Sequence, residues 1–158
     1  MPRVSTCLWF DGTAEEAARF YTSIVRDSEV TAVHVAPAGL PYNEEGSVLL
    51  VEFTLGGQEF QALNGGAQFP FTEAASIVLN CETQQEADEY WDALTADGEE
   101  GVCGWCKDRY GLSWQIAPEA ATAATLNPDP EAARRAFEQM MTMTRLDGDV
   151  LARAARGE

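Results

Sequence analysis

Positively charged residues are scarce in this sequence. The 158 residues include ten lysines and arginines against 26 aspartates and glutamates, which gives a formal net charge of −16. A surface with this charge repels the phosphate backbone, so we expect no nucleic acid among the partners. The charge instead predicts an acidic and well solvated surface.

Long apolar runs are also missing. No segment approaches the roughly 20 apolar residues that span a bilayer, and the N-terminus lacks a basic region followed by an apolar one. We therefore expect no membrane partner, no signal peptide and a cytoplasmic location. Hydrophobic residues still make up 46% of the chain, which allows a packed core in one domain or in two small fused modules.

Histidine occurs once and cysteine four times. His34 falls in a predicted strand with no carboxylate at ligand spacing, so we interpret it as an ordinary surface or half-buried residue. Cys103 and Cys106 form a Cys-x-x-Cys motif, but this leads into a predicted hairpin, whereas a redox motif needs a helix N-terminus. A four-thiolate zinc site would need Cys7 and Cys81 to join the pair, and no second Cys-x-x-Cys exists. We expect reduced, structural cysteines.

The segment 102–118 is predicted to be a hairpin. An Asp-Arg-Tyr-Gly turn ends at Gly111, which can take a positive φ, and the two arms are marked by Trp105 and Trp114. Gln115 lies in the second arm between bulky apolar neighbours. Its amide therefore points either at water or into a cavity, and the functional interpretation depends on which.

A repeat organises most of the chain. The capping-box pattern Thr-x-x-Glu begins at Thr13 and again at Thr83, each time after a predicted strand and before a helical apolar pattern. Further residues align in pairs, the first strands at this shift of 70 and the last strands at a shift of 54: Thr6 with Ser76, and Gln61 with Gln115. We infer two modules of the order strand–helix–strand–strand–strand, each with one sheet face that pairing would bury.

These elements predict an α+β fold in three parts: residues 1–66 as the first module, 67–118 as the second, and 119–158 as a helical tail. In the first module we expect strands at 4–10, 30–35, 48–55 and 58–63, with a helix after Thr13. In the tail we expect a helix over 131–144 and a last helix capped by Asp147. Residues 131–155 carry more apolar surface than so acidic a monomer would expose, which favours burial against the sheet or in a dimer.

Several motifs, spread over nearly the whole chain, carry a family resemblance: Leu8-Trp9-Phe10, Ala62-Leu63-Asn64-Gly65-Gly66, Asn80-Cys81-Glu82-Thr83, Tyr90-Trp91 and Asp108-x-Tyr110-Gly111-Leu112-Ser113-Trp114-Gln115-Ile116. They resemble the PhnB-like group of the vicinal oxygen chelate superfamily, which includes glyoxalase I, extradiol dioxygenases and bleomycin-resistance proteins. Proteins of this group are often labelled 3-demethylubiquinone-9 3-methyltransferase. The resemblance implies two tandem βαβββ modules with strongly curved sheets, a glyoxalase-like fold, and a homodimer.

Metalloenzymes of this superfamily take ligands, typically His or Gln and Glu, from the first and last strand of each module. The resemblance places these positions at Thr6, Gln61, Ser76 (or its neighbour Ala75) and Gln115. All are neutral, whereas a divalent cation prefers carboxylate or imidazole donors. We therefore predict no metal and no cofactor. The methyltransferase label also finds no support, because no glycine-rich strand-to-helix turn is present.

We expect a metal-free protein that binds a small, partly apolar molecule, without predicting which molecule. Six residues are candidates for its site: Thr6, Gln61, Ser76, Gln115, Trp105 and Phe69. The two aromatic residues are equally compatible with a place in the core. Two alternatives stay open: an enzyme of glyoxalase, dioxygenase or isomerase type that uses neutral donors or a metal site elsewhere, and a drug-sequestering resistance protein.

Overall fold

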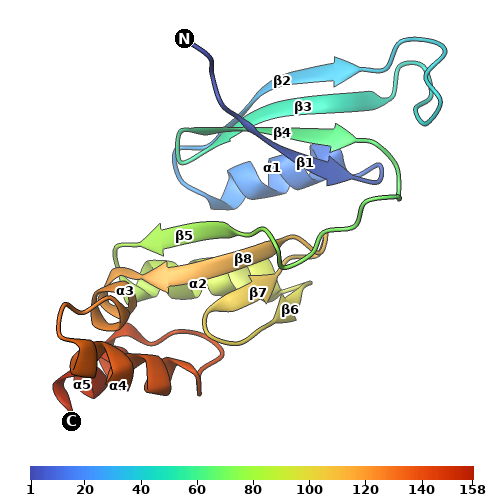
Figure 1. Ribbon diagram of the computed structural model, residues 1–158. Coiled ribbons are helices and arrows are strands. Elements are labelled where there is room, and N and C mark those ends of the chain that lie inside the picture. The colour runs from blue at the N-terminus through green and yellow to red at the C-terminus, as the bar shows by residue number, and fades with distance from the viewer. The chain divides into compact units, whose positions relative to one another are not determined.

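A computed structural model describes residues 1–158, which form two compact units, Met1–Phe71 and Thr72–Glu158 (Figure 1). The elements follow in this order: β1 (Thr6–Phe10), α1 (Ala14–Ile24), β2 (Glu29–Val35), β3 (Val48–Leu55), β4 (Gln58–Asn64), β5 (Ile77–Cys81), α2 (Gln84–Thr95), β6 (Glu99–Glu100), β7 (Trp105–Lys107), β8 (Ser113–Pro118), α3 (Glu119–Thr125), α4 (Pro130–Met140) and α5 (Gly148–Arg156). The predicted α+β fold, with two βαβββ modules and C-terminal helices, is confirmed. No helix combines the length and apolar character needed to cross a membrane.

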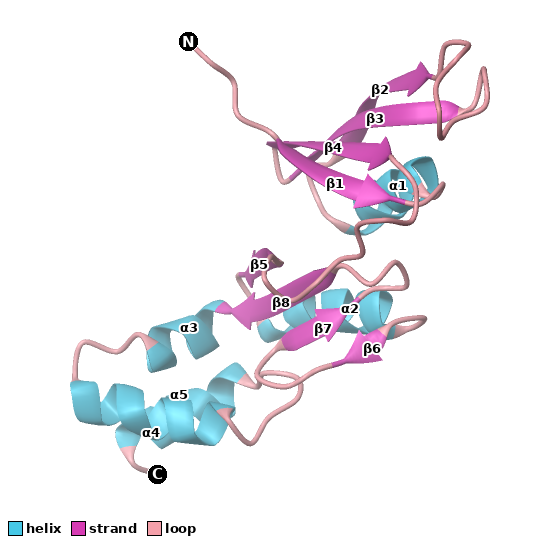
Figure 2. Cartoon of the chain, turned by 45° about the vertical axis from the view of Figure 1, so that its right-hand side comes forward, coloured by secondary structure: helices cyan, strands magenta, loops and turns pink.

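The first unit is a four-stranded sheet with α1 on one face (Figure 2). The strand order is β1-β4-β3-β2, and only the β1–β4 pair is parallel. Alternate residues of β3 are buried, as period-two patterning requires. Tyr21 of α1 lies against Phe53, which in turn stacks on Phe60 with ring centroids 5.5 Å apart. One face of the sheet therefore packs on α1; the other is called here the helix-free face.

The second unit repeats this arrangement, with the order β5-β8-β7-β6 and α2 packed on one face. Trp91 and Leu94 of α2 are buried, as are Cys106 and Trp114 on the facing strands. Gly111 has a φ of 83°, so the predicted turn is confirmed. As before, the face opposite the helix is the helix-free face.

A buried carboxylate organises the turn between β7 and β8. Asp108 is 3% exposed, and its Oδ1 accepts hydrogen bonds from the backbone amides of Tyr110 and Leu112. Its Oδ2 accepts a third hydrogen bond from Trp114 Nε1 at 2.8 Å. One side chain thus ties the turn to the core of the second unit.

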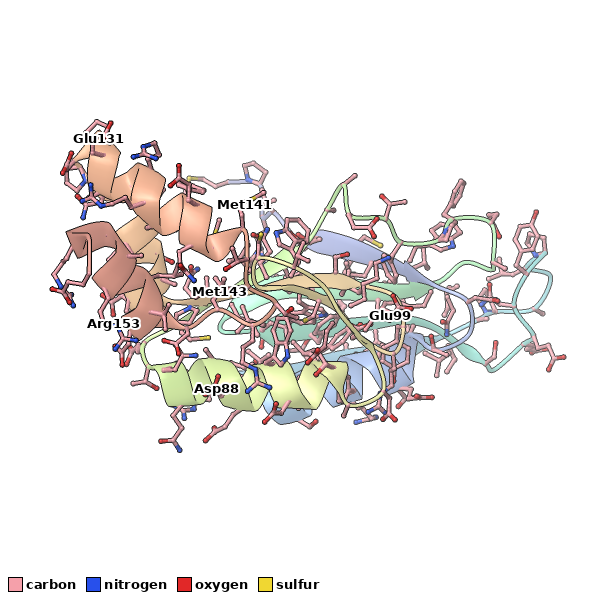
Figure 3. The ribbon with its side chains drawn as sticks, turned by 90° about the horizontal axis from the view of Figure 1, so that it is seen from below. Asp88, Glu99, Glu131, Met141, Met143 and Arg153 are labelled. Atoms are coloured by element: carbon pink, nitrogen blue, oxygen red, sulfur yellow. The ribbon has the colours of Figure 1, made fainter.

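The C-terminal helices pack on one another and are hydrogen-bonded to the rest of the second unit. Their shared core is made of small residues and two leucines: Ala121, Ala124, Ala132, Ala136, Leu146, Leu151 and Ala155. The segment after α4, where Figure 3 labels Met143, accepts backbone hydrogen bonds from the β6–β7 loop: Cys103 to Met143 and Gly104 to Thr144, both at 2.8 Å. The predicted helix over 131–144 ends earlier, at Met140.

Two of the three predicted helix caps are present in the structure. Thr83 accepts from the amide of Glu86 at 3.1 Å, and Asp147 caps α5 by accepting from Val150, so both predictions are confirmed. The prediction for Thr13 is wrong, because its side chain makes no capping hydrogen bond. The amide of Ala14 instead donates to Asn64 Oδ1.

Candidate ligand-binding site

Strand pairing defines which side chains of the first unit share a face. Gln61 is paired with Cys7 on β1 and with Glu52 on β3, so all three lie on the helix-free face. Thr6 is paired with Phe60, whose ring packs on the side of α1. Thr6 and Gln61, both candidate site residues, therefore belong to opposite faces of this sheet.

The second unit brings three candidate residues together. Gln115 is paired with Trp105, and Gln115 Nε2 donates to Ser76 Oγ at 2.9 Å. Val78 is the parallel neighbour of Gln115 on β5. The amide of Gln115 therefore lies on the helix-free face, where it is half-buried and hydrogen-bonded to Ser76, the residue before β5.

The same registers refine the repeat. Thr6 is opposite Phe60, whereas Ile77 is opposite Trp114, the residue 54 positions after Phe60. The first strands thus match at a shift of 71, one residue more than the helices. Ser5, rather than Thr6, is the structural counterpart of Ser76.

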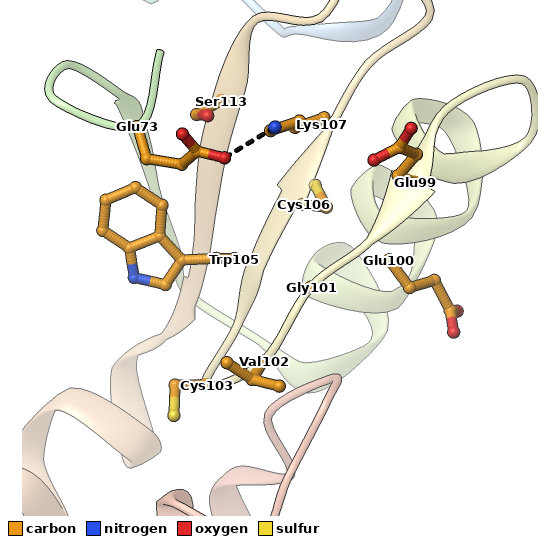
Figure 4. A pocket seen from close by; sticks show the side chains of 10 residues that line it. All are labelled: Glu73, Glu99, Glu100, Gly101, Val102, Cys103, Trp105, Cys106, Lys107 and Ser113. Atoms are coloured by element: carbon orange, nitrogen blue, oxygen red, sulfur yellow. Dashed lines mark ion pairs between the residues drawn. The ribbon is translucent and has the colours of Figure 1, made fainter.

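A pocket of about 490 Å³ opens in the second unit (Figure 4). Its walls come from the segment before β5, from β6, the β6–β7 loop and β7, and from the start of β8: Glu73, Glu99, Glu100, Gly101, Val102, Cys103, Trp105, Cys106, Lys107 and Ser113. Lys107 is the only lysine of the chain, and its Nζ lies 2.6 Å from Glu73 Oε1. This contact lowers the pKa of Glu73 and raises the pKa of Lys107, so both stay charged at neutral pH.

A hollow of about 440 Å³ occupies the corresponding place in the first unit. It is lined from the segment before β1 and from the three following strands: Arg3, Ser5, Thr31, Ala32, Glu52, Phe53, Thr54, Glu59, Phe60 and Gln61. An ion pair again crosses it, here between Arg3 and Glu59. The two units therefore carry hollows at equivalent places of the repeat, with different charges around them.

Phe69 is not among the residues that line either hollow. Its ring packs edge-on against Trp9 of the same unit, with centroids 5.0 Å apart, and the residue is 63% exposed. Neither ring lines the pocket of the second unit.

A histidine–carboxylate pair lies on the helix-free face of the first unit. His34 Nε2 lies 2.9 Å from Glu52 Oε2, and His34 is exposed, in keeping with its interpretation as a surface residue. The partner comes from the neighbouring strand, where sequence spacing gives no signal. Across residues 1–158, no group of three or more His, Cys, Asp or Glu side chains is placed to hold a metal ion.

All four cysteines are free. Cys103 lies in the β6–β7 loop and Cys106 in β7, so the Cys-x-x-Cys motif enters a hairpin as predicted. Burial raises the pKa of Cys106 to about 12, and the nearby carboxylates of Asp108 and Glu100 act in the same direction. The thiol of Cys106 is therefore protonated at neutral pH, unlike the thiolate of a redox motif.

A family model and several solved structures match this chain. The family model described as 3-demethylubiquinone-9 3-methyltransferase matches residues 2–117. The solved structure of the PhnB protein from Bacillus cereus is 36% identical, with a TM-score of 0.67 over 74% of this chain and 99% of its own. A structure from Pseudomonas aeruginosa, 19% identical, has a TM-score of 0.63 over 75% of this chain and 98% of its own, which concerns the fold alone.

No curated protein matches the chain. The family match ends at residue 117, so α3, α4 and α5 lie beyond it. The family model covers the two βαβββ modules. The chain therefore belongs to the 3-demethylubiquinone-9 3-methyltransferase family, the PhnB-like group of the vicinal oxygen chelate superfamily.

Proposed function

We propose that this protein binds a small molecule on the helix-free faces of its modules, without a metal, in the cytoplasm. The observation that carries the proposal is the repeated hollow, about 440 Å³ in the first unit and about 490 Å³ in the second. Both volumes fall in the range of small-molecule pockets, roughly 300–1,000 Å³. The four free cysteines agree with a reducing compartment.

The neutral side chains on these faces suit ligand recognition by hydrogen bonds. Gln61 and Gln115 each carry an amide that can both donate and accept. Ser76 supplies a hydroxyl beside Gln115, and Trp105 an apolar surface next to it. Thr6 and Phe69, the other two candidates, lie outside these faces, because Thr6 is on the α1 side of its sheet and Phe69 packs against Trp9.

Ligand profiling of the purified native protein tests this function. We expect native mass spectrometry against a metabolite library to find a bound molecule that also raises the midpoint of thermal unfolding. Gln115→Ala should weaken that binding, whereas Gln85→Ala, an exposed glutamine of α2, should not. A ligand recovered unchanged would indicate sequestration, as in drug-resistance relatives, and a converted one would indicate an enzyme. A library that yields no ligand would contradict the proposal.

One observation favours a second candidate, a metal-dependent enzyme of the superfamily. His34 and Glu52 lie 2.9 Å apart on the face that also carries Gln61. Imidazole, carboxylate and amide groups together resemble the ligand types of the superfamily's metal sites. Metal analysis of protein purified without chelators distinguishes the two candidates. Stoichiometric metal in the unmodified protein that is lost in His34→Ala would support the metal-dependent enzyme and contradict the first proposal.

A homodimer is part of the first proposal. The tail leaves large apolar side chains in water, with Leu126 71%, Phe137 44% and Met141 70% exposed. Light scattering should give a mass near twice the 17.2 kDa of one chain. A monomer at micromolar concentration would exclude the dimer while leaving ligand binding untouched.

A further inference from the structure

The pocket of the second unit contains a buried polar atom without a partner. Ser113 is 1% exposed, and its Oγ makes no hydrogen bond with any other group of the protein. Buried hydroxyl groups in native proteins are nearly always paired, so this exception needs an explanation. Ser113 lines the pocket, which places its hydroxyl where a ligand can supply the partner (Figure 4).

The neighbour of Ser113 decides what kind of partner fits. Lys107 is paired with Ser113 across β7 and β8, so both side chains lie on the same face. The ammonium of Lys107 has three N–H donors and no acceptor, and Glu73 accepts from it at 2.6 Å. An acceptor oxygen of a ligand beside Ser113 and Lys107 can accept a hydrogen bond from each of them. A donor group of a ligand would instead face the N–H donors of Lys107.

The charges around the pocket disfavour a ligand with a net charge. Glu73 and Glu99 both lie beside Lys107, so an added carboxylate would meet two like charges. An added ammonium next to Ser113 would meet Lys107. The Glu100 carboxylate points away and binds Trp91 Nε1 at 3.0 Å (Figure 4). A neutral oxygen is the acceptor that leaves the Lys107–Glu73 pair intact.

Apolar groups form the rest of the pocket. Trp105 and Val102 line it, and Val102 is 66% exposed. The loop that carries Val102 is fixed by the tail, since the amides of Cys103 and Gly104 donate to the segment after α4. At Gly104, with a φ of 81°, a Cβ atom would approach Leu146 to 2.8 Å. This wall is therefore held by a part of the chain outside the family match.

The first unit lacks these features. At the place of Ser113, 54 residues earlier, stands Glu59, which pairs with Arg3. Glu52, the partner of Gln61, takes the place of Trp105. The corresponding hollow thus has charged side chains in place of Ser113 and Trp105, and no buried hydroxyl is left unpaired there.

We propose that the pocket of the second unit binds a neutral carbonyl compound with an aromatic or branched apolar body. Its carbonyl oxygen accepts hydrogen bonds from Ser113 Oγ and Lys107 Nζ, and its body packs against Trp105 and Val102. The inference rests on the proposed function and deepens it, because it names one site and the chemical class that enters it. Amides, ketones and esters of modest size belong to this class.

Three probes of nearly equal size test the class with the full-length protein: phenylacetamide, phenylacetate and 2-phenylethylamine. They share a benzyl group and differ in charge, being neutral, negative and positive. Titration followed by ligand-observed NMR should give phenylacetamide a Kd about fivefold lower than that of either charged probe. Ser113→Ala should raise the Kd of phenylacetamide about fivefold, the usual effect of one lost hydrogen bond. Ser23→Ala, the same change at an exposed serine of α1, should leave it unchanged.

The thermal stability of Ser113→Ala, measured without any probe, gives an independent readout. Ser113→Ala removes an unpaired buried hydroxyl, so it should raise the thermal midpoint of the free protein. The same change should weaken the binding of phenylacetamide. An unchanged Kd in Ser113→Ala would overturn the inference, as would tighter binding of either charged probe. So would the absence of binding by all three at about 10 mM, the Kd that ordinary ligand efficiency gives molecules of this size. In each case, ligands found by library profiling would leave the broader function standing.

Discussion

Asn64 Oδ1 accepts a hydrogen bond from the backbone amide of Ala14 at 2.9 Å, so the last strand of the first module caps the module's own helix. The amide nitrogen of the same side chain donates to the carbonyl of Val48, also at 2.9 Å. Asn64 is 7% exposed. One buried amide therefore joins α1 to β3 and β4, and takes over the role that the sequence pattern gives to Thr13.

Asn64→Ala should lower the free energy of unfolding by about 2 kcal/mol, because it removes a cap of α1 and the hydrogen bond to the part-buried carbonyl of Val48. Thr13→Ala should cost less than about 0.5 kcal/mol, since this threonine makes no capping bond. Thr83→Ala, which removes a real N-cap, should cost about 1 kcal/mol. Urea unfolding of the three variants measures this order. A larger effect at Thr13 than at Asn64 would contradict the assignment.

The order of strands and helices in both modules could be predicted, because alternating apolar residues and Gly-containing turns are local signals. The Asn64 cap could not, since it joins residues 50 positions apart. The predicted pairing of Thr6 with Ser76 is one residue out of register for a related reason. Two residues separate Phe10 from Thr13, but one separates Cys81 from Thr83. Aligning the caps therefore shifts the first strands by one position and turns Thr6 to the wrong face.

The candidate site shows the same limit. Gln61 and Gln115 occupy equivalent strands, and their pairing could be found from the repeat. The contact between His34 and Glu52 depends on the register of β2 with β3, which shifts between Val30 and Ala32. No sequence signal reports such an irregularity.

Asp108 offers a test of the second hairpin. It accepts hydrogen bonds from two backbone amides and from Trp114 Nε1, so Asp108→Ala leaves three donors without their acceptor. We expect the free energy of unfolding to fall by about 3 kcal/mol. Asp97→Ala is the matched control, because its ion pair with Arg109 lies at the surface and should contribute less than about 1 kcal/mol. Equal losses in the two variants, measured by urea unfolding, would refute this role.

Gln84 links α2 to the tail and has an exposed neighbour for comparison. Its Nε2 donates to the carbonyl of Leu146 at 2.8 Å, and its Oε1 accepts from the amide of Gly148 at 2.9 Å. Gln84→Ala should therefore loosen the tail and lower the free energy of unfolding by about 2 kcal/mol. Gln85→Ala, which removes only a surface contact with Glu89, should change it by less than about 0.5 kcal/mol. Hydrogen exchange of the Gly148 amide should accelerate in the first variant only.

The buried thiols predict how stability depends on alkaline pH. Burial raises the pKa of Cys81 and of Cys106 from 9.0 to about 12. Between about pH 9 and 12 the unfolded chain loses these protons while the folded chain keeps them. The folded state then binds more protons, so stability is complete below about pH 9 and falls as pH rises, by up to about 1.4 kcal/mol per pH unit for each thiol.

Substitution isolates this contribution from those of other groups that titrate in the same range. Cys106→Ala lowers stability at all pH values by its lost packing, but it should flatten the decline between pH 9 and 11 relative to the unmodified protein. Cys103→Ala is the matched control, because it makes the same chemical change in the β6–β7 loop, where the thiol is only half-buried. Urea unfolding at a series of pH values, under reducing conditions, gives the three slopes. Parallel curves for Cys106→Ala and the unmodified protein would mean that the Cys106 thiol titrates alike in the folded and unfolded states.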